Sequence, residues 1–206
     1  MENLIIRYPC LAVCKDDIRK AIDTIIDSYK NGGKLLLCGN GGSCADCEHI
    51  VGELMKGFLS KRPISISQKL YMKRNNPNLT DEVLSKLQLA VPAVALPSFS
   101  GLNSAFCNDV DAELIYAQSL MGLGAKCDVV FCISTSGNSK NCVAAANVAK
   151  GLGLTVVALT GQTGGKLKEI TDICICAPEI ETYKVQELHL PIYHLICMEI
   201  EKEFFG

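Results

Sequence analysis

The stretch LLLCGNGGSCADCEHIVGEL, residues 35–54, decides the fold. Its apolar start is typical of a buried strand, and the turn GNGGS at 39–43 leads directly into a pattern typical of a helix. A strand that turns into a helix in this way predicts one unit of a parallel α/β sheet. An ordinary turn needs one glycine or two, so the extra small residues predict a loop that lets a ligand approach the backbone.

The remainder of the chain repeats this alternation of strand and helix. We expect strands at 34–38, 91–96, 128–133, 154–159 and 173–177. We expect helices at 15–31, 43–58, 102–108, 111–123, 139–151, 165–170 and 182–204, with Ser43 capping the second of them. Apolar strands separated by helices predict an α/β domain with a doubly wound, five-stranded parallel sheet, an extra N-terminal helix and a long C-terminal helix.

Residues 59–88 differ in composition from the rest of the single domain that we expect over residues 1–206. They are polar and rich in lysine, and prolines at 63 and 77 interrupt them. A short helix with Thr80 as its cap is expected near their end. We interpret the segment as an excursion from the domain, exposed at a subunit edge.

Composition limits the classes of protein to which the chain can belong. It has 206 residues, 49% of them hydrophobic, and a net charge of −2, which fits one globular domain without an evident basic face for nucleic acid. No apolar run reaches the roughly 20 residues of a membrane helix, and the N-terminus lacks the pattern of a signal peptide. Many of the twelve cysteines lie in apolar runs, which indicates free thiols in a cytoplasmic protein.

Cys44 and Cys47 form a C-x-x-C pair in the first turn of the expected helix after the loop. A thiolate is favoured at a helix start, but a redox motif of the thioredoxin type belongs to a different βαβ setting. We therefore expect the pair to contribute to packing, with redox function as the weaker alternative.

Two loops of glycine, serine and asparagine follow expected strands and lead into helices, GNGGS at 39–43 and STSGNS at 134–139. The backbone N–H groups at a helix start have no partner within the helix, and the helix dipole adds positive potential there. Hydroxyl groups add neutral donors for phosphate oxygens. Ligands of such folds bind at the carboxyl ends of the strands, where both loops fall, so we expect a small phosphorylated ligand between them.

The three histidines of the chain, His49, His189 and His194, all lie in the two expected helices that flank this loop region. His49 and Glu53 are four residues apart and therefore share one helix face. Two chemistries fit. Histidine and glutamate could move protons beside a carbonyl group, or a divalent metal such as Zn²⁺ could bind to the set His49, Glu53, Gln186 and His194.

Three segments together resemble the sugar-isomerase (SIS) domain, and within it the phosphoheptose isomerases. They are CGNGGSCADCEHIVGEL at 38–54, CISTSGNSKN at 132–141 and VQELHLPIYHLICMEIE at 185–201. STSGNS is typical of SIS domains in general, whereas the first and third segments are more specific to the heptose isomerases. The resemblance runs from about residue 15 to the C-terminus, interrupted by the excursion, and it implies the flavodoxin-like SIS fold.

The resemblance implies an aldose–ketose isomerase that converts sedoheptulose 7-phosphate to D-glycero-D-manno-heptose 7-phosphate through an enediolate. It implies Glu53 and His194 as the catalytic pair, and His49, Glu53, Gln186 and His194 as a zinc site. The substrate and phosphate would be held by Asn40, Gly41, Gly42, Ser43, Asp109, Ser134, Thr135, Ser136, Ser139 and Gln186. The family is homotetrameric, with sites built from neighbouring subunits.

The chain departs from the family's usual pattern at two places. An arginine usually follows the glutamate, where this chain reads Met55-Lys56-Gly57, and an Asp-Arg pair usually precedes the glutamine, where it reads Tyr183-Lys184. These changes bear on substrate recognition, so a pentose, hexose or modified sugar phosphate stays open beside the heptose. The rival function is a non-catalytic SIS protein that senses a sugar phosphate or binds the replication initiator DnaA; such relatives lack the glutamate and histidine.

Overall fold

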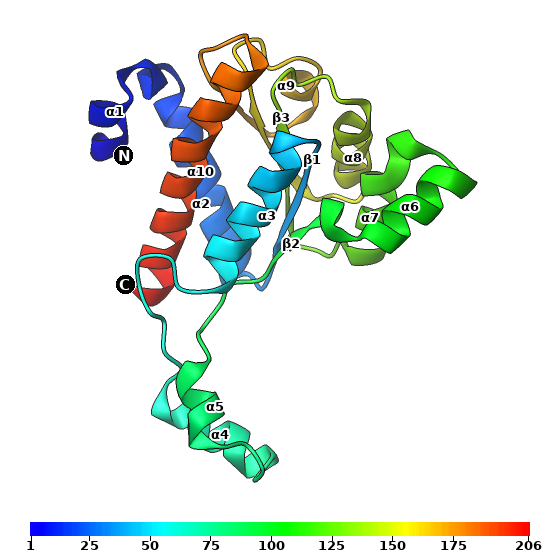
Figure 1. The fold of residues 1–206 in the computed structure, drawn as a ribbon. Helices are drawn as coiled ribbons and strands as arrows, with labels where there is room; N and C mark the ends of the chain where they lie inside the picture. The colour runs from blue at the N-terminus through cyan, green and yellow to red at the C-terminus, as the bar shows by residue number, and fades with distance from the viewer.

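The computed structural model describes all 206 residues, and a parallel sheet of five strands forms its centre (Figure 1). The strands are β1 (Leu35–Gly39), β2 (Ala93–Ala95), β3 (Val129–Ser134), β4 (Thr155–Thr160) and β5 (Ile173–Cys176). Their order in the sheet is β2-β1-β3-β4-β5, and every neighbouring pair is parallel. This order is that of the flavodoxin-like doubly wound fold, so the fold class expected from the sequence is confirmed.

Helices cover both faces of this sheet (Figure 1). The helices of the whole chain are α1 (Glu2–Arg7), α2 (Lys15–Lys30), α3 (Gly42–Met55), α4 (Ile66–Asn75), α5 (Asp81–Lys86), α6 (Ser100–Asp109), α7 (Ile115–Leu123), α8 (Lys140–Gly151), α9 (Leu167–Ile170) and α10 (Thr182–Phe205). Short 3₁₀ turns lie at Pro9–Cys14, Leu96–Ser98 and Ala112–Leu114.

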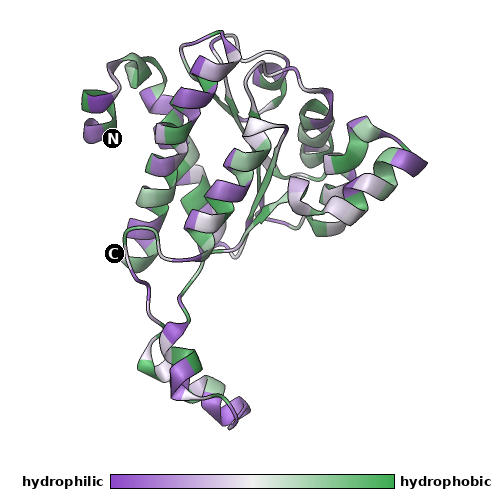
Figure 2. Ribbon diagram, in the orientation of Figure 1, coloured by the Kyte–Doolittle hydropathy of each residue, from purple (hydrophilic) through white to green (hydrophobic).

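Alternation of side chains along the central strands produces two cores. Leu35 and Leu37 of β1 face α2, α3 and α10, whereas Leu36 and Cys38 face α7 and α8. All four are fully buried, as expected for a parallel strand covered on both faces. Figure 2 shows apolar residues on the inward surfaces of these helices and polar residues outside. The two cores fix α3 and α10 side by side on one face.

The switch in strand order falls between β1 and β3, and it brings the two glycine-serine loops together. Gly39 at the end of β1 is in register with Ile133, one residue before the end of β3. The loops after these strands therefore leave the sheet at the same edge. In doubly wound folds this crevice is where ligands bind.

The excursion at 59–88 forms a two-helix arm of α4 and α5 that projects from the body (Figure 1). The sequence predicted the second helix, and Thr80 caps it by accepting a hydrogen bond from the N–H of Val83 at 3.3 Å. It did not predict α4, which begins after a capping box formed by Ser65 and Gln68.

Two details of α3 differ from the sequence expectation. The helix begins at Gly42, with Gly41 as its N-cap at φ +56°, so Ser43 lies inside the first turn and does not cap it. Glycine tolerates this left-handed φ, which lets the chain turn one residue earlier. The helix ends at Met55 and not at residue 58, because Lys56 is extended.

All twelve cysteines are free thiols. The five that lie in the apolar runs of the expected strands and of the last helix differ in how far they are buried. Cys38, Cys132 and Cys197 are buried, whereas Cys174 and Cys176 of the edge strand β5 are only partly covered. None of the helices combines the length and the apolar character needed to cross a membrane.

Candidate functional site

The loop that follows β3 presents a row of hydroxyl groups at the sheet edge. The hydroxyls of Ser134 and Ser139 lie 2.9 Å apart, and the hydroxyl of Ser136 accepts a hydrogen bond from the N–H of Asn138 at 3.1 Å. Gly137 has φ +66° and packs so closely on the 161–165 loop that an added Cβ would lie 1.9 Å from the carbonyl oxygen of Gly164. The glycine is therefore required for the shape of this loop.

The loop that follows β1 is tied to the helix that follows β3. The amide groups of Asn40 and Asn141 exchange two hydrogen bonds of 2.8 and 2.9 Å. The hydroxyl of Tyr116 donates to the carbonyl oxygen of Gly39 at 2.7 Å and also lies 3.0 Å from Oδ1 of Asn40. These bonds hold the two loops as one rigid cradle. Sequence analysis did not single out Asn141 or Tyr116.

Gln186, in the first turns of α10, lies against the same cradle. Its Nε2 would be 2.3 Å from a Cβ added at Gly42, so the side-chain amide packs directly on the glycine backbone. Ser43 is buried in the first turn of α3. The structure thus brings together the members of the expected phosphate and sugar set that come from these loops and from α10.

Further along α3, His49 and Glu53 meet His194 of α10. Nε2 of His49 lies 3.2 Å from Oε1 of Glu53, and Nζ of Lys56 lies 3.2 Å from Oε2 of Glu53. The rings of His49 and His194 are edge to face with centroids 5.1 Å apart. The expected catalytic pair and the second expected imidazole therefore form one cluster on adjacent helices, about 9 to 15 Å along α3 from Ser43 at the 1.5 Å rise of a helix.

His194 sits in an aromatic and partly apolar setting. Its ring also contacts Tyr193 and Phe58, with centroid distances of 5.2 and 5.5 Å. Burial lowers the pKa of the His194 imidazole, the positive charge of a protonated His49 lowers it further, and the carboxylate of Glu53 opposes both. Nε2 of His194 is buried and has no hydrogen-bond partner. A neutral imidazole with a free nitrogen is suited to proton transfer.

Tyr193 and Asp46 form a second layer behind His49. The Tyr193 hydroxyl donates to Oδ1 of Asp46 at 3.2 Å and lies 3.0 Å from Nδ1 of His49. Asp46, His49 and Glu53 share one face of α3 at spacings of three and four residues, a signal that sequence reasoning could have used. Nothing in the sequence pattern points to Tyr193, because its contact with α3 depends on how α10 crosses that helix.

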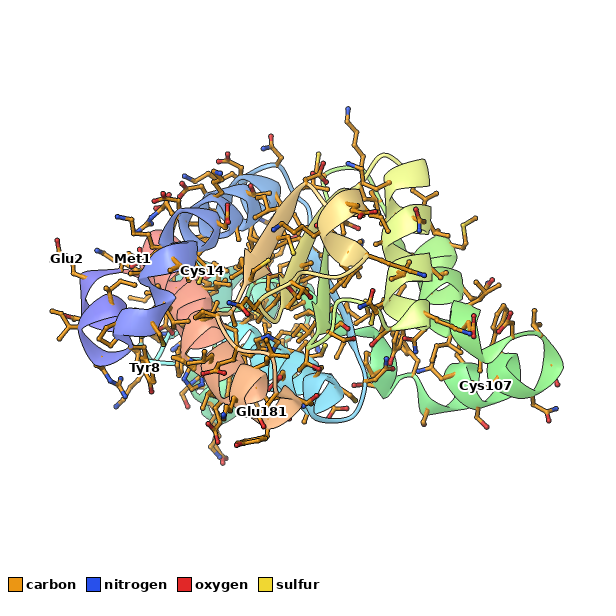
Figure 3. All side chains as sticks on the ribbon, turned by 90° about the horizontal axis from the view of Figure 1, so that it is seen from above. Met1, Glu2, Tyr8, Cys14, Cys107 and Glu181 are labelled. Carbon is orange, nitrogen blue, oxygen red and sulfur yellow. The ribbon has the colours of Figure 1, made fainter.

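Two other residues lie apart from this cluster. Asp109 is exposed at the end of α6, where Oδ1 accepts a 2.8 Å hydrogen bond from Nδ2 of the neighbouring Asn108. Figure 3 shows Cys107, two residues earlier, at the outer edge of the molecule. The single chain therefore does not bring Asp109 to Glu53. His189 is fully buried, and its Nε2 bonds to the carbonyl oxygen of Thr160 at 3.2 Å.

A cavity of about 480 Å³ lies between α1 and α10. Of the expected site residues only His194 lines it, together with Phe58 and Met1 among others. The cavity opens on the side of His194 next to α1, so it is not the loop cradle itself.

The expected zinc ligands fit a divalent cation in type but are not drawn together. Imidazole and carboxylate are usual zinc ligands, and Nε2 of His194 has no hydrogen-bond partner that a metal ion would have to displace. Yet Nε2 of His49 and Oε1 of Glu53 face each other at 3.2 Å, and no three His, Cys, Asp or Glu side chains are arranged to share one ion. A bound cation would need these side chains to turn toward a common point.

Comparison with known proteins gives one consistent result. A model of the SIS domain matches residues 11–91 and 85–161. The phosphoheptose isomerase of Akkermansia muciniphila is 33% identical over 199 residues, which are 97% of this chain and 92% of that protein, and that of Helicobacter hepaticus is 38% identical over 90% of this chain and 82% of that protein.

Solved structures give the same picture. A phosphoheptose isomerase structure from Francisella tularensis has a TM-score of 0.76 and 26% identity, covering 98% of this chain and 94% of that one. The structure of the enzyme from Neisseria gonorrhoeae has a TM-score of 0.74 and 27% identity, covering 97% and 93%.

Proposed function

The chain belongs to the SIS domain family and, within it, to the phosphoheptose isomerases, and from this we propose that it interconverts sedoheptulose 7-phosphate and D-glycero-D-manno-heptose 7-phosphate. The resemblance seen in the sequence is thereby confirmed. The observation that carries the proposal is the cluster of Glu53, His49 and His194 beside a hydroxyl-lined cradle of two loops. A cradle alone would only bind a phosphate ester, whereas the cluster supplies the groups that move protons.

The reaction follows from the two parts of this site. The backbone N–H groups and the hydroxyls of Ser134, Thr135, Ser136 and Ser139 hold the phosphate end. The Glu53 carboxylate takes the proton from C1 of the open-chain ketose, and the electron pair forms an enediolate. Glu53 returns the proton to C2, while His194 moves a proton between the two oxygens. Such proton transfers each contribute about 10²- to 10⁴-fold.

We include a divalent cation, Zn²⁺, in the proposal, held by His49, Glu53, Gln186 and His194. Its support is the donor chemistry and the unpartnered, buried Nε2 of His194. When bound, the ion would polarise the substrate carbonyl and stabilise negative charge on oxygen. The protein's own part is to orient Glu53 and His194 toward the carbon and the oxygens.

The test of the function is conversion itself. Metal-free and Zn²⁺-loaded protein is incubated with sedoheptulose 7-phosphate, and aldose formation is followed by NMR, with Glu53→Gln and His194→Ala as controls. We expect both substitutions to lower kcat by at least about 10²-fold while the phosphate ester still binds. Unchanged turnover in Glu53→Gln would remove the isomerase proposal. No conversion by the unsubstituted protein, with binding retained, would mean another sugar phosphate or a sensor.

We also propose that the protein is a homotetramer whose sites use residues of neighbouring subunits. The support is Asp109, which the single chain leaves exposed at the end of α6 although the resemblance assigns it to the substrate. Glu53→Gln and Asp109→Ala chains would each be inactive, and mixing them in one oligomer should restore part of the activity. Failure of mixed oligomers, verified by light scattering, to recover activity would contradict shared sites.

The non-catalytic alternative is not favoured, because the relatives and solved structures that cover most of this chain are phosphoheptose isomerases. Twelve free thiols support a reducing compartment, so we place the protein in the cytoplasm. We take residues 1–206 as one functional domain, with the α4–α5 arm as an appendage at a subunit edge. Nothing in the charge balance of −2 supports nucleic-acid binding.

A further inference from the structure

Cys174 and Cys176 of β5 form an accessible pair of thiols at the edge of the sheet. They lie two positions apart, so their side chains share one face of the strand. Their sulfur atoms are 3.7 Å apart, and both residues are partly exposed. The hydroxyl of Thr160, on the neighbouring strand β4, lies 3.5 Å from Sγ of Cys174 and 3.7 Å from Sγ of Cys176. Three donor atoms from two strands thus form a nearly equilateral triangle.

The three distances match one face of a tetrahedral metal site. Two sulfur ligands at about 2.3 Å from a zinc ion are about 3.8 Å apart, and a sulfur ligand is about 3.6 Å from an oxygen ligand at about 2.1 Å. The hydroxyl of Thr160 donates its own proton to the carbonyl oxygen of Gly161 at 3.1 Å, which leaves its lone pairs for an ion. Because both cysteines are partly exposed, the fourth ligand can be a water molecule.

The pair also supplies the thiolate that a metal ion requires. The hydrogen bond from the Cys174 thiol holds the pKa of Cys176 below its ordinary value; burial opposes this shift, and Thr160 and the charge of Lys168 support it. The same hydrogen bond raises the pKa of Cys174, so the pair keeps one proton when it loses the other.

Another close pair of thiols lacks these properties. The sulfur atoms of Cys38 and Cys132 are 3.5 Å apart, but both residues are fully buried in the core. Hydrogen bonds from the neighbouring thiols, followed by burial, raise the pKa of Cys38 well above its ordinary value. This pair therefore stays protonated and closed to solvent, whereas the β5 pair combines ionisation with access.

A shared ion suits the β5 pair better than a disulfide does. At a rise of about 3.3 Å per residue, side chains two positions apart on a strand leave the backbone about 6.6 Å from each other. A disulfide requires Cβ atoms that are about 3.5–4.5 Å apart. A metal ion adds two bonds between the sulfur atoms and needs no movement of the strand.

We propose that Cys174, Cys176 and Thr160 form a binding site for a thiophilic divalent cation such as Zn²⁺, with no residue in common with the metal site of the proposed function. Binding releases the proton that the thiol pair retains, and the two thiolates and the hydroxyl fill three ligand positions. The ion joins the edge strand β5 to β4. The N–H of Gly161, directly after Thr160, bonds to the carbonyl oxygen of Thr135 in the cradle at 2.9 Å, so the ion also braces the phosphate loop.

The probe is Cd²⁺, which replaces Zn²⁺ in tetrahedral sites and gives an ultraviolet charge-transfer absorption only when thiolates bind it. Reduced, metal-free protein is titrated with Cd²⁺ at neutral pH, and we expect the absorption to saturate at one ion per chain. At the same Cd²⁺ concentrations, Cys174→Ser and Cys176→Ser should each lose it. The cation site of the proposed function has no sulfur ligand, so it adds nothing to the signal and its failure would leave this test intact.

Cys132→Ala is the matched control, because its thiol also lies against another sulfur but is buried. It should leave the titration unchanged. A second measurement needs no variant: Zn²⁺ should protect Cys174 and Cys176 from alkylation, followed by mass spectrometry, but not the exposed Cys107. The inference is overturned if the unsubstituted protein gives no absorption, if the absorption survives both serine substitutions, or if Zn²⁺ leaves the alkylation of the β5 pair unchanged.

Discussion

Glu201 of α10 is the residue whose substitution most directly tests how the two helices of the site are held together. Its carboxylate accepts four hydrogen bonds: from the backbone N–H groups of Phe58, Leu59 and Ser60 at 2.8, 2.7 and 3.2 Å, and from Nε of Arg62 at 2.7 Å. Its side chain is 5% exposed. The segment that follows α3 is therefore anchored to α10 through the carboxylate of Glu201.

Arg62 completes the link back to α3. Its guanidinium donates to the carbonyl oxygens of Leu54 and Glu53 at 2.7 and 3.1 Å, which lie at the end of α3; the Leu54 oxygen also accepts from the N–H of Val91 at 3.3 Å. The side chain of Arg62 is fully buried, and its backbone adopts φ +46°, a left-handed conformation that is costly for a residue other than glycine. Such a conformation persists only where the surrounding bonds enforce it.

Glu201→Gln preserves the shape of the side chain and removes its charge. Either orientation of the amide turns its NH₂ group toward two of the four donors, and each unsatisfied buried donor costs about 1–3 kcal/mol. The sum, about 2–6 kcal/mol, agrees with the 3–5 kcal/mol that is typical when one partner of a buried ion pair is removed. Since domains unfold with about 5–15 kcal/mol, this is a large share of the stability.

The assay is urea unfolding followed by circular dichroism at fixed protein concentration, with Glu199→Gln as the matched control. Glu199 lies two residues away in α10 and is more exposed, at 27%, with longer contacts of 3.9 Å to the N-terminus and 3.7 Å to Arg19. Its loss should cost less than about 1 kcal/mol. Equal destabilisation by the two substitutions would refute the reasoning.

The pH dependence gives a second measure of the same carboxylate. Burial acts to raise the pKa of Glu201, but the N–H groups of Phe58 and Leu59 and the Arg62 guanidinium outweigh it and hold the pKa below the ordinary value of 4.5. The stabilisation is therefore complete above about pH 4.5 and lost as the pH falls through the lower, folded pKa. Glu201→Gln should remove this acid-side loss.

Two further outcomes are expected from buried groups near the cradle. Gly137→Ala should raise KM and lower the unfolding free energy by about 1–3 kcal/mol, because Gly137 has φ +66° and an added Cβ would lie 1.9 Å from the carbonyl oxygen of Gly164. An unchanged KM in steady-state assays would contradict this prediction. Burial lowers the pKa of His189 from 6.5 to about 4, although the hydrogen bond to Thr160 opposes this shift. The unfolding free energy should therefore fall by roughly 1.4 kcal/mol per pH unit as the pH drops from 6.5 to about 4. His189→Gln should flatten that slope in denaturant titrations at several pH values, and an unaltered slope would assign it to other groups.

The sheet and its switch point were predictable from sequence because buried parallel strands are continuous apolar runs. Val129–Ser134 and Thr155–Thr160 could be placed to within a residue or two for this reason. The helix α4 was not predicted, since its composition is polar and its hydrophobic residues lie on no single buried face. The only sequence signal for α4 is the capping box of Ser65 and Gln68, a local pattern that composition alone does not reveal.

The position of the loop residues and the pairing of His49 with Glu53 could also be predicted, because both depend on spacing along one segment. Contacts between segments that are distant in the sequence could not be predicted in this way. Tyr193 touches His49 only because α10 packs against α3, and Arg62 reaches the Glu53 carbonyl only because the segment after α3 turns back onto the end of that helix. Asp109 shows the opposite limit: the resemblance predicts that it contacts the substrate, while the single chain leaves it exposed at the end of α6.

These contacts make stability and activity dependent on the same two helices. α3 carries His49 and Glu53, α10 carries His194, and the Arg62–Glu201 pair joins their ends. A misplacement of about 1 Å between reacting groups can cost about 10²-fold in rate. Glu201→Gln should therefore lower kcat even under conditions where the protein remains folded, and Glu199→Gln should not. A folded Glu201→Gln protein with full kcat would show that the remaining contacts between α3 and α10, their shared core included, are enough to keep the helices in register.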